Sequence, residues 1–472
     1  MVLSSLDAFV DGIPPKLVAE LPLITNDLED SWIQGAAQAP DTLKAHKALQ
    51  RGLSACAARE VGCQPTRRLN ASGTIFKSDS VAGFARLLSK NIEHTFGASL
   101  PKFSPDPIEY GDYSNAAFHA AVARGDQTYA FYRRSWDENR LFGVDGAMAA
   151  VTHGSTISRY LEDELTKLSK PGDLTRDLAS FSRLKQLSES VVLGGWLRVA
   201  IGATGALAEC VDLRTNTSWA SHERPLAALS YQTLTDDDFV AFRSAYLWDG
   251  AYGSGYEEYG RPNATKAAGA RSTRVLPAPR AAYAKDDALL IMLDIDDGGL
   301  FHESYGAPST FWLRLDAPTP GQADVTVSLL NKTSTRYLES TYLSFDPSRE
   351  GDWWLQKLGR WLNPAETAVG AGRNLHATDA VALSPLADDD SAALVITNAE
   401  SALALFPGSA GPVPYPDLVD VDTSRGVAFP LLANGYWNTN YPTFLPFDAI
   451  HANYSFRFSL AFVQRGAGGV EN

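Results

Sequence analysis

The segment Asn91–Gly97, NIEHTFG, sets a carboxylate, an imidazole and a hydroxyl beside one another. A neutral imidazole held by a rigid element is a good zinc ligand, which makes His94 the first candidate for metal binding. One histidine is not a metal site, because zinc takes three or four protein ligands. From the local sequence alone the favoured interpretation is simpler: His94 lies near the carboxyl end of a helix and interacts with its dipole.

The residues before this segment must form the element that positions it. In Val81–Ile92 the apolar side chains recur at the spacing of one helix face, at Phe84, Leu87, Leu88 and Ile92. This pattern predicts a helix that delivers His94 at its C-terminal end.

Composition limits the classes to which the protein can belong. The 472 residues are 45% hydrophobic, which predicts a globular protein of two or three domains. The formal net charge of −14 argues against a nucleic-acid partner, since such proteins present a basic surface. We expect no membrane span, because apolar stretches such as Val191–Ala208 contain Arg198 and several glycines. The first ten residues lack the basic and apolar regions of a signal peptide.

Cysteine and asparagine patterns leave the compartment open. Cys56 and Cys63 are separated by AAREVG, which is too wide for a CxxC motif, and Cys210 makes the count odd. A bridge between Cys56 and Cys63 stays one alternative. Asn-x-Ser/Thr sequons favour the secretory pathway, whereas the missing signal peptide argues against it; they lie at Asn70, Asn216, Asn263, Asn331 and Asn453.

The hydrophobic period changes once along the chain. Up to about residue 195 apolar residues recur at helical spacing, in segments 41–53, 81–92, 114–123, 129–150 and 157–168. Beyond that point short alternating runs lie between Gly, Pro, Asn and Asp clusters, for example 288–293, 310–315, 323–330, 393–397 and 454–462. The sequence thus predicts a helical bundle domain over residues 1–195, followed by a large antiparallel β-sandwich over residues 196–472.

Motifs of several common enzyme classes are missing, while aromatic residues are clustered. The sequence has no GxSxG elbow, P-loop or HExxH motif. Aromatic clusters at Trp353–Trp361 and Tyr436–Phe444 offer ring faces on which a sugar can pack, although Trp more often fills a core. In the first cluster we expect Trp354, Leu358 and Trp361 to share a buried face.

Separate stretches over most of the chain carry one resemblance. They are LEDSWIQGAAQAPDTLK from Leu28, NIEHTFG from Asn91, RRSWDENRLF from Arg133, much of Arg336–Val381, and GYWNTNYPTF from Gly435 with YSFRFSLAF from Tyr454. In this order they resemble the C-terminal two-thirds of an uncharacterised branch of the glycoside hydrolase family 38 clan, the zinc-dependent retaining α-mannosidases. The resemblance implies a mutarotase-like sandwich, a carbohydrate ligand and a zinc-binding role for His94.

The resemblance does not include the zinc-binding pair and the nucleophile expected for the clan. The clan is expected to begin with an α/β domain that carries a His-x-Asp zinc pair and an Asp nucleophile, yet none of the eight histidines here is followed two positions on by Asp. We therefore expect the α/β domain to be missing or to be a separate partner, and the zinc ligand set to be incomplete. Asp30 is the candidate proton donor, and Trp32, Glu93 and Trp437 are candidates for substrate binding.

Two functions remain open. The first is the helical and β-sandwich portion of an α-mannosidase-like retaining glycosidase, in which one carboxylate attacks the anomeric carbon and a second donates a proton. We expect the isolated chain to be inactive in that case. The alternative is a non-catalytic carbohydrate-binding or scaffolding protein, in which the aromatic clusters contact the ligand.

Overall fold

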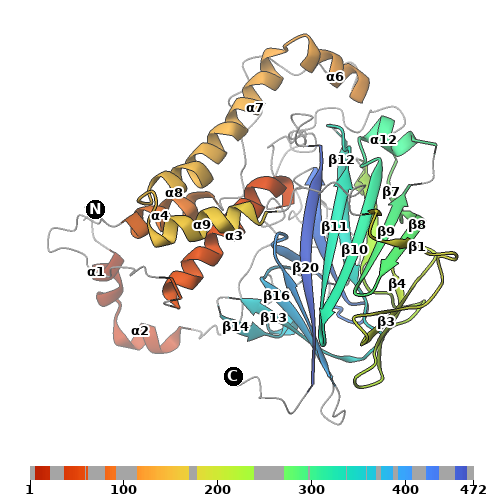
Figure 1. Ribbon diagram of the computed structural model, residues 1–472. Coiled ribbons are helices and arrows are strands. Elements are labelled where there is room, and N and C mark those ends of the chain that lie inside the picture. Colours follow the sequence, from red (N-terminus) through yellow and green to blue (C-terminus); the bar gives the residue numbers. More distant parts are fainter. Residues whose placement is uncertain are drawn as a thin grey trace.

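The computed structural model contains a group of helices that lies beside a body of β-sheets (Figure 1). The helices come mainly from the first third of the chain, coloured red to yellow, and the strands follow in yellow-green to blue. The structure describes residues 6–21, 37–58, 60–61, 80–91, 114–168, 178–235, 237–238, 271–295, 298–335, 337–357, 359–367, 374–385, 392–406, 421–434 and 452–464.

The described helices are concentrated before residue 170. They are α1 Leu6–Asp11, α2 Pro15–Glu20, α3 Pro40–Ala57, α4 Ser80–Asn91, α6 Asn115–Ala123, α7 Gln127–Arg140, the π-helix η2 Leu141–Asp145, α8 Gly146–Ala149 and α9 Thr156–Thr166. Two short helices follow among the strands, α12 Leu300–Tyr305 and the 3-10 helix η5 Pro364–Glu366. No described helix is long and apolar enough to cross a membrane.

Side chains mark where these helices begin. Ser114, Asp126 and Ser155 each accept a hydrogen bond from a backbone amide of the first turn, at 3.2, 3.0 and 3.2 Å, ahead of α6, α7 and α9. Such caps satisfy amides that have no partner within the helix. A core of their own holds the helices together, with Leu49 of α3, Phe84 of α4 and Leu161 of α9 all fully buried.

The strands form three antiparallel sheets. The ten-stranded sheet joins β1 Ser182–Arg183, β8 Ala278–Lys285, β9 Ala288–Asp294, β10 Thr310–Thr319, β11 Gln322–Leu330, β20 Tyr454–Val463, β17 Ala393–Asn398, β16 Ala380–Pro385, β13 Gly351–Lys357 and β14 Arg360–Leu362, in this order. The six-stranded sheet joins β15 Leu375–Ala377, β18 Leu403–Leu405, β19 Val427–Asn434, β12 Leu338–Phe345, β6 Ala228–Leu234 and β7 Thr273–Val275. The four-stranded sheet joins β2 Val191–Leu193, β3 Leu197–Ile201, β4 Leu207–Asp212 and β5 Thr217–Ala220.

Alternate residues of these strands build the core between the sheets. Phe458 of β20, in the ten-stranded sheet, packs on Phe345 of β12 and Phe429 of β19, in the six-stranded sheet, with ring centroids 5.9 and 5.1 Å apart. Their neighbours two positions along each strand are buried as well, because side chains alternate between the faces of a strand. The sheets therefore form a β-sandwich.

A polar network also ties α6 to the sandwich. Asn115 Nδ2 donates to Thr335 Oγ1 at 2.8 Å and to the Ser304 carbonyl at 2.6 Å. Close by along the chain, Lys332 and Glu339 form an ion pair with almost no exposure, and Glu339 also accepts from the Tyr231 hydroxyl. A buried ion pair is tolerated only where both groups have partners.

Several expectations from the sequence are confirmed. The five helical segments correspond to α3, α4, α6, the continuous run α7–η2–α8, and α9, and the five strand examples correspond to β9, β10, β11, β17 and β20. The boundary drawn at residue 195 stays a proposal, and β1 and β2 lie N-terminal to it.

Cys56 is disulfide-bonded and Cys210 is a buried free cysteine, while Cys63 lies outside the described residues.

The expectation that Trp354 and Trp361 are buried is wrong, since both are half-buried. Their spacing with Leu358 belongs to a helix, but Trp354 lies in β13 and Trp361 in the paired strand β14. Strand alternation turns Trp353 and Leu355 into the core, where they are 3% and 1% exposed, and leaves Trp354 half-buried on the other face. Leu358 lies outside the described residues.

Adjacent tryptophans therefore provide a test of the register of β13. We expect Trp353→Ala to lower the free energy of unfolding by about 3–5 kcal/mol, because it leaves a cavity against Phe406. Trp354→Ala should cost clearly less. Chemical denaturation of both variants measures the difference, and an equal or reversed cost would contradict the register.

A second prediction concerns the contact between α3 and α9. A Cβ added at Gly52 would lie 2.2 Å from Cδ2 of Leu161, whose side chain is fully buried in the helical core. We expect Gly52→Ala to destabilise the protein by about 1–3 kcal/mol, despite the better helix propensity of alanine.

The matched control is Gly83 in α4. There an added Cβ would meet Ala150 at 3.6 Å, an ordinary contact. Gly83→Ala should be neutral or stabilise by up to about 1 kcal/mol. Thermal unfolding of the two variants would refute the close approach of α3 and α9 if both shifted the melting temperature alike.

Candidate functional site

The residues that the sequence singled out for chemistry lie outside the described part of the structure. This holds for Asp30, Trp32, Glu93, His94 and Trp437. The helix expected to lead to His94 is present as α4, which ends at Asn91. The roles of these five residues therefore stay predictions.

The described residues do not supply a zinc site. Among them no group of three or more His, Cys, Asp or Glu side chains is arranged to hold a metal ion. Zinc needs three or four protein ligands, so the donor set found here does not fit it.

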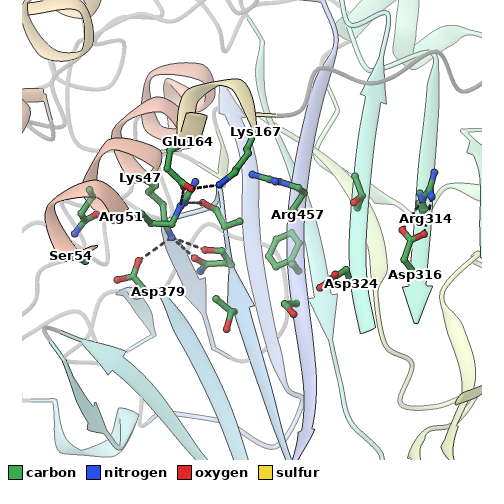
Figure 2. A pocket seen from close by; sticks show the side chains of 17 residues that line it. Lys47, Arg51, Ser54, Glu164, Lys167, Arg314, Asp316, Asp324, Asp379 and Arg457 are labelled. Carbon is green, nitrogen blue, oxygen red and sulfur yellow. Dashed lines mark hydrogen bonds and ion pairs between the residues drawn. The ribbon is translucent and has the colours of Figure 1, made fainter. Parts of the chain in front are cut away.

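The described residues do form a polar cleft of about 710 Å³ between the helices and the outer face of the ten-stranded sheet (Figure 2). α3 and the end of α9 form one side, and the strands β10, β11, β17 and β20 form the other. We call it the helix–sheet cleft. It is lined by Lys47, Gln50, Arg51, Ser54, Glu164, Lys167, Arg314, Asp316, Asp324, Thr326, Asp379, Thr397, Asn398, Ala399, Arg457, Phe458 and Ser459.

Strand register orders the polar groups on the sheet side into two rows. The first row crosses the sheet through the paired positions Arg314, Thr326 and Arg457. The second row runs two residues along each strand, through Asp316, Asp324, Ser459 and Thr397. Their side chains share one face because the residues between them point into the core.

Ion pairs hold the two arginines of the first row in place. Arg314 donates to both carboxylate oxygens of Asp316, at 2.7 and 2.9 Å. Arg457 Nε donates to Glu400 at 2.6 Å, and the backbone amide of Arg457 donates to the other oxygen of that buried carboxylate at 2.5 Å. Asp324 is exposed and has no ion pair among the described residues.

The helix side is anchored by a lysine and an arginine one turn apart on α3. Lys47 Nζ donates to the carbonyl oxygens of Asn398 and Ser401, at 2.9 and 2.7 Å, and lies 3.2 Å from Asp379. Arg51 reaches the Ala399 carbonyl at 3.1 Å and Glu164 of α9 at 2.6 Å. Both side chains thus bridge α3 to the chain that follows β17.

The charges in the cleft influence one another. Burial lowers the pKa of Lys47, although the charge and hydrogen bond of Asp379 oppose this effect. Burial would raise the pKa of Glu164, but hydrogen bonds from Arg51 and Lys167 outweigh it and hold that pKa below its usual value. The cleft therefore presents hydrogen-bond donors that are positively charged and acceptors that are negatively charged, all held in place. Such a lining suits a neutral ligand rich in hydroxyl groups.

Sequence reasoning missed this cleft. Its sheet side consists of the polar members of alternating strands. The alternation of Arg457 and Ser459 with core phenylalanines predicts a half-buried strand, but nothing local indicates that a helix lies over its polar face. Contacts such as Lys47 with Asn398 join residues 351 positions apart.

His46, next to Lys47, is a buried histidine of α3. Its side chain is 8% exposed, and its Nδ1 has no hydrogen-bond partner in the described part of the chain. Burial, followed by the charge of Lys47, lowers the pKa of His46 to about 4 against the opposing effect of Asp379. The folded protein therefore keeps this imidazole neutral.

We expect the stability contributed by neutral His46 to be present above about pH 6.5 and to fall as the pH drops toward 4. Between these values the unfolded chain binds a proton that the folded chain does not, which costs up to about 3 kcal/mol. His46→Gln should reduce the loss of unfolding free energy between neutral pH and about pH 4.5 by about 2–3 kcal/mol. Denaturant titrations at the two pH values measure it; an unchanged loss would contradict the prediction.

Comparison with known proteins adds a family. Curated proteins include none that matches this sequence. Two solved structures from Enterococcus faecalis are similar to the chain at 10% identity. For an alpha-mannosidase the TM-score is 0.34, over 60% of this chain and 30% of that one. For a protein in the glycosyl hydrolase family 38 it is 0.43, over 98% of this chain and 60% of that one.

A putative aldose 1-epimerase from Escherichia coli is also similar, at 8% identity and a TM-score of 0.30, over 60% of this chain and 99% of that one. The chain thus spans less than two thirds of the length of either Enterococcus protein. TM-scores of this size support no inference about activity. A family model described as "Domain of unknown function (DUF5054)" matches residues 65–325, and because this is more than half of the chain, the protein belongs to that family.

Proposed function

We propose that this protein is carbohydrate-active and that the helix–sheet cleft binds a sugar. The observation that carries the proposal is the pair of polar rows on the sheet, centred on Thr326 and Asp324. Sugar hydroxyls both donate and accept hydrogen bonds, and the rows offer carboxylates, hydroxyls and guanidinium groups at strand spacing.

Pre-organisation supports the same proposal. Arg457 is held by Glu400 and Arg314 by Asp316, so the geometry of the cleft is present before a ligand binds. A rigid site loses less entropy on binding than a mobile one. The strands beneath it are fixed by the sandwich core.

The finer proposal is that the chain is the helical and β-sandwich portion of an α-mannosidase-like retaining glycosidase. It is supported by the resemblance of Leu28–Lys44 and Asn91–Gly97 to that clan. In this proposal Asp30 donates the proton, His94 is a zinc ligand, and Trp32, Glu93 and Trp437 contact the sugar. The nucleophile would come from an α/β domain outside this sequence.

Binding tests the role of the helix–sheet cleft. Asp324→Ala removes an exposed carboxylate that forms no ion pair with any other described residue, and we expect it to weaken binding of an oligomannoside about ten-fold or more. Asp352→Ala is the matched control, since Asp352 is an exposed strand residue of the same sheet that does not line the cleft. Calorimetric titration measures both. Equal affinity in the two variants would count against the cleft.

Activity and metal content test the finer proposal separately. The chain is assayed for bound zinc and for hydrolysis of an aryl α-mannoside, alone and with the α/β domain that this proposal requires. Zinc binding and turnover that arise together on addition support the glycosidase portion. Sugar binding with neither would indicate the non-catalytic alternative.

A further inference from the structure

Three of the five sequons lie in described residues, and the structure distinguishes them. Asn216, Asn331 and Asn453 are all exposed. The sequon pattern requires the Ser or Thr hydroxyl as well as the asparagine. The environment of that hydroxyl differs between the three positions.

Asn216 lies in the turn between β4 and β5 and has a left-handed backbone, with φ of 57°. Its sequon partner Ser218 is exposed, and the Ser218 hydroxyl makes one weak hydrogen bond, of 3.3 Å, to the Ala220 carbonyl. A protruding turn with both groups accessible suits modification.

Asn331 follows β11 directly and has the same backbone conformation, with φ of 54°. Asn331 is exposed, and its sequon partner Thr333 is half-buried. Asn331 therefore also presents its side chain at a turn.

Asn453 differs in both respects. Its Oδ1 accepts a hydrogen bond of 2.8 Å from the backbone amide of Asn331, so its side chain is held against the neighbouring turn. Its sequon partner Ser455 is 1% exposed within β20, with its hydroxyl 3.5 Å from that of Ser328. A glycan on Asn453 would also crowd one on Asn331.

A separate observation concerns the compartment. Cys56 of α3 is disulfide-bonded. Disulfides form and persist in oxidising compartments such as the lumen where N-linked glycans are attached.

We propose that Asn216 and Asn331 carry N-linked glycans and that Asn453 does not. In the reaction the side-chain amide nitrogen forms a bond to the anomeric carbon of a lipid diphosphate-linked oligosaccharide. The bond from that carbon to the diphosphate oxygen breaks, the lipid diphosphate leaves, and the amide loses a proton. No electrons are transferred. Neither asparagine lines the helix–sheet cleft.

Occupancy is measured on the full chain from its native source. Release of glycans by an N-glycosidase in heavy-oxygen water marks each occupied asparagine as labelled aspartate, which peptide mass spectrometry locates. The proposal expects the mark at Asn216 and Asn331 and its absence at Asn453. An unmarked Asn216 or Asn331, or a marked Asn453, overturns the assignment at that position.

Variants of the acceptor hydroxyl test the same sites without disturbing the left-handed asparagines. In secreting cells, Ser218→Ala and Thr333→Ala should each remove one glycan and increase electrophoretic mobility by one step. Ser218→Thr and Thr333→Ser keep the sequon and should retain it. Ser455→Ala should change nothing. If Ser218→Ala and Thr333→Ala left the electrophoretic mobility unchanged, the proposal would be overturned.

Discussion

The placement of α3 depends on burying a charged group. Moving an ammonium group out of water is unfavourable unless its protons find acceptors. Lys47 meets this condition through the carbonyl oxygens of Asn398 and Ser401 and the carboxylate of Asp379. One turn earlier, Lys44 packs over the Phe456 ring, 4.3 Å from its centroid. An apolar contact would allow α3 to shift along the sheet. The ammonium group of Lys47, in contrast, reaches all of these acceptors in only one position of the helix.

The helix–sheet cleft follows from this anchor. Arg51 extends the same face of α3 and ties Glu164 of α9 to the sheet, so both helices are held by one set of contacts. The side chains that make these contacts are long and charged, and they leave a polar space rather than a packed core. A second attachment, through Asn115 and Thr335, lies on α6. The helices and the sandwich keep separate apolar cores and are joined here largely through polar groups.

The two tryptophans of β13 show how residue spacing can point to the wrong buried ring. The spacing by four and three residues that begins at Trp354 is that of a helix face, whereas Trp354 lies in a strand. Trp353, not Trp354, faces the core, because side chains alternate along a strand. A shift of one residue in register reverses every side chain of a strand.

The sequence by itself determined the kinds of element and their order. Periodicity of 3.6 marked α3, α4 and α9, and periodicity of 2 marked β10 and β20, because burial of one face imposes these spacings on the residues themselves. Only the tertiary structure decided which polar faces meet. The register of β11 against β20 and the docking of Lys47 on Asn398 bring together residues far apart in the chain, and no local pattern encodes that pairing. Contacts over such separations depend on the whole arrangement of the sheet, so the helix–sheet cleft exists only in the folded protein.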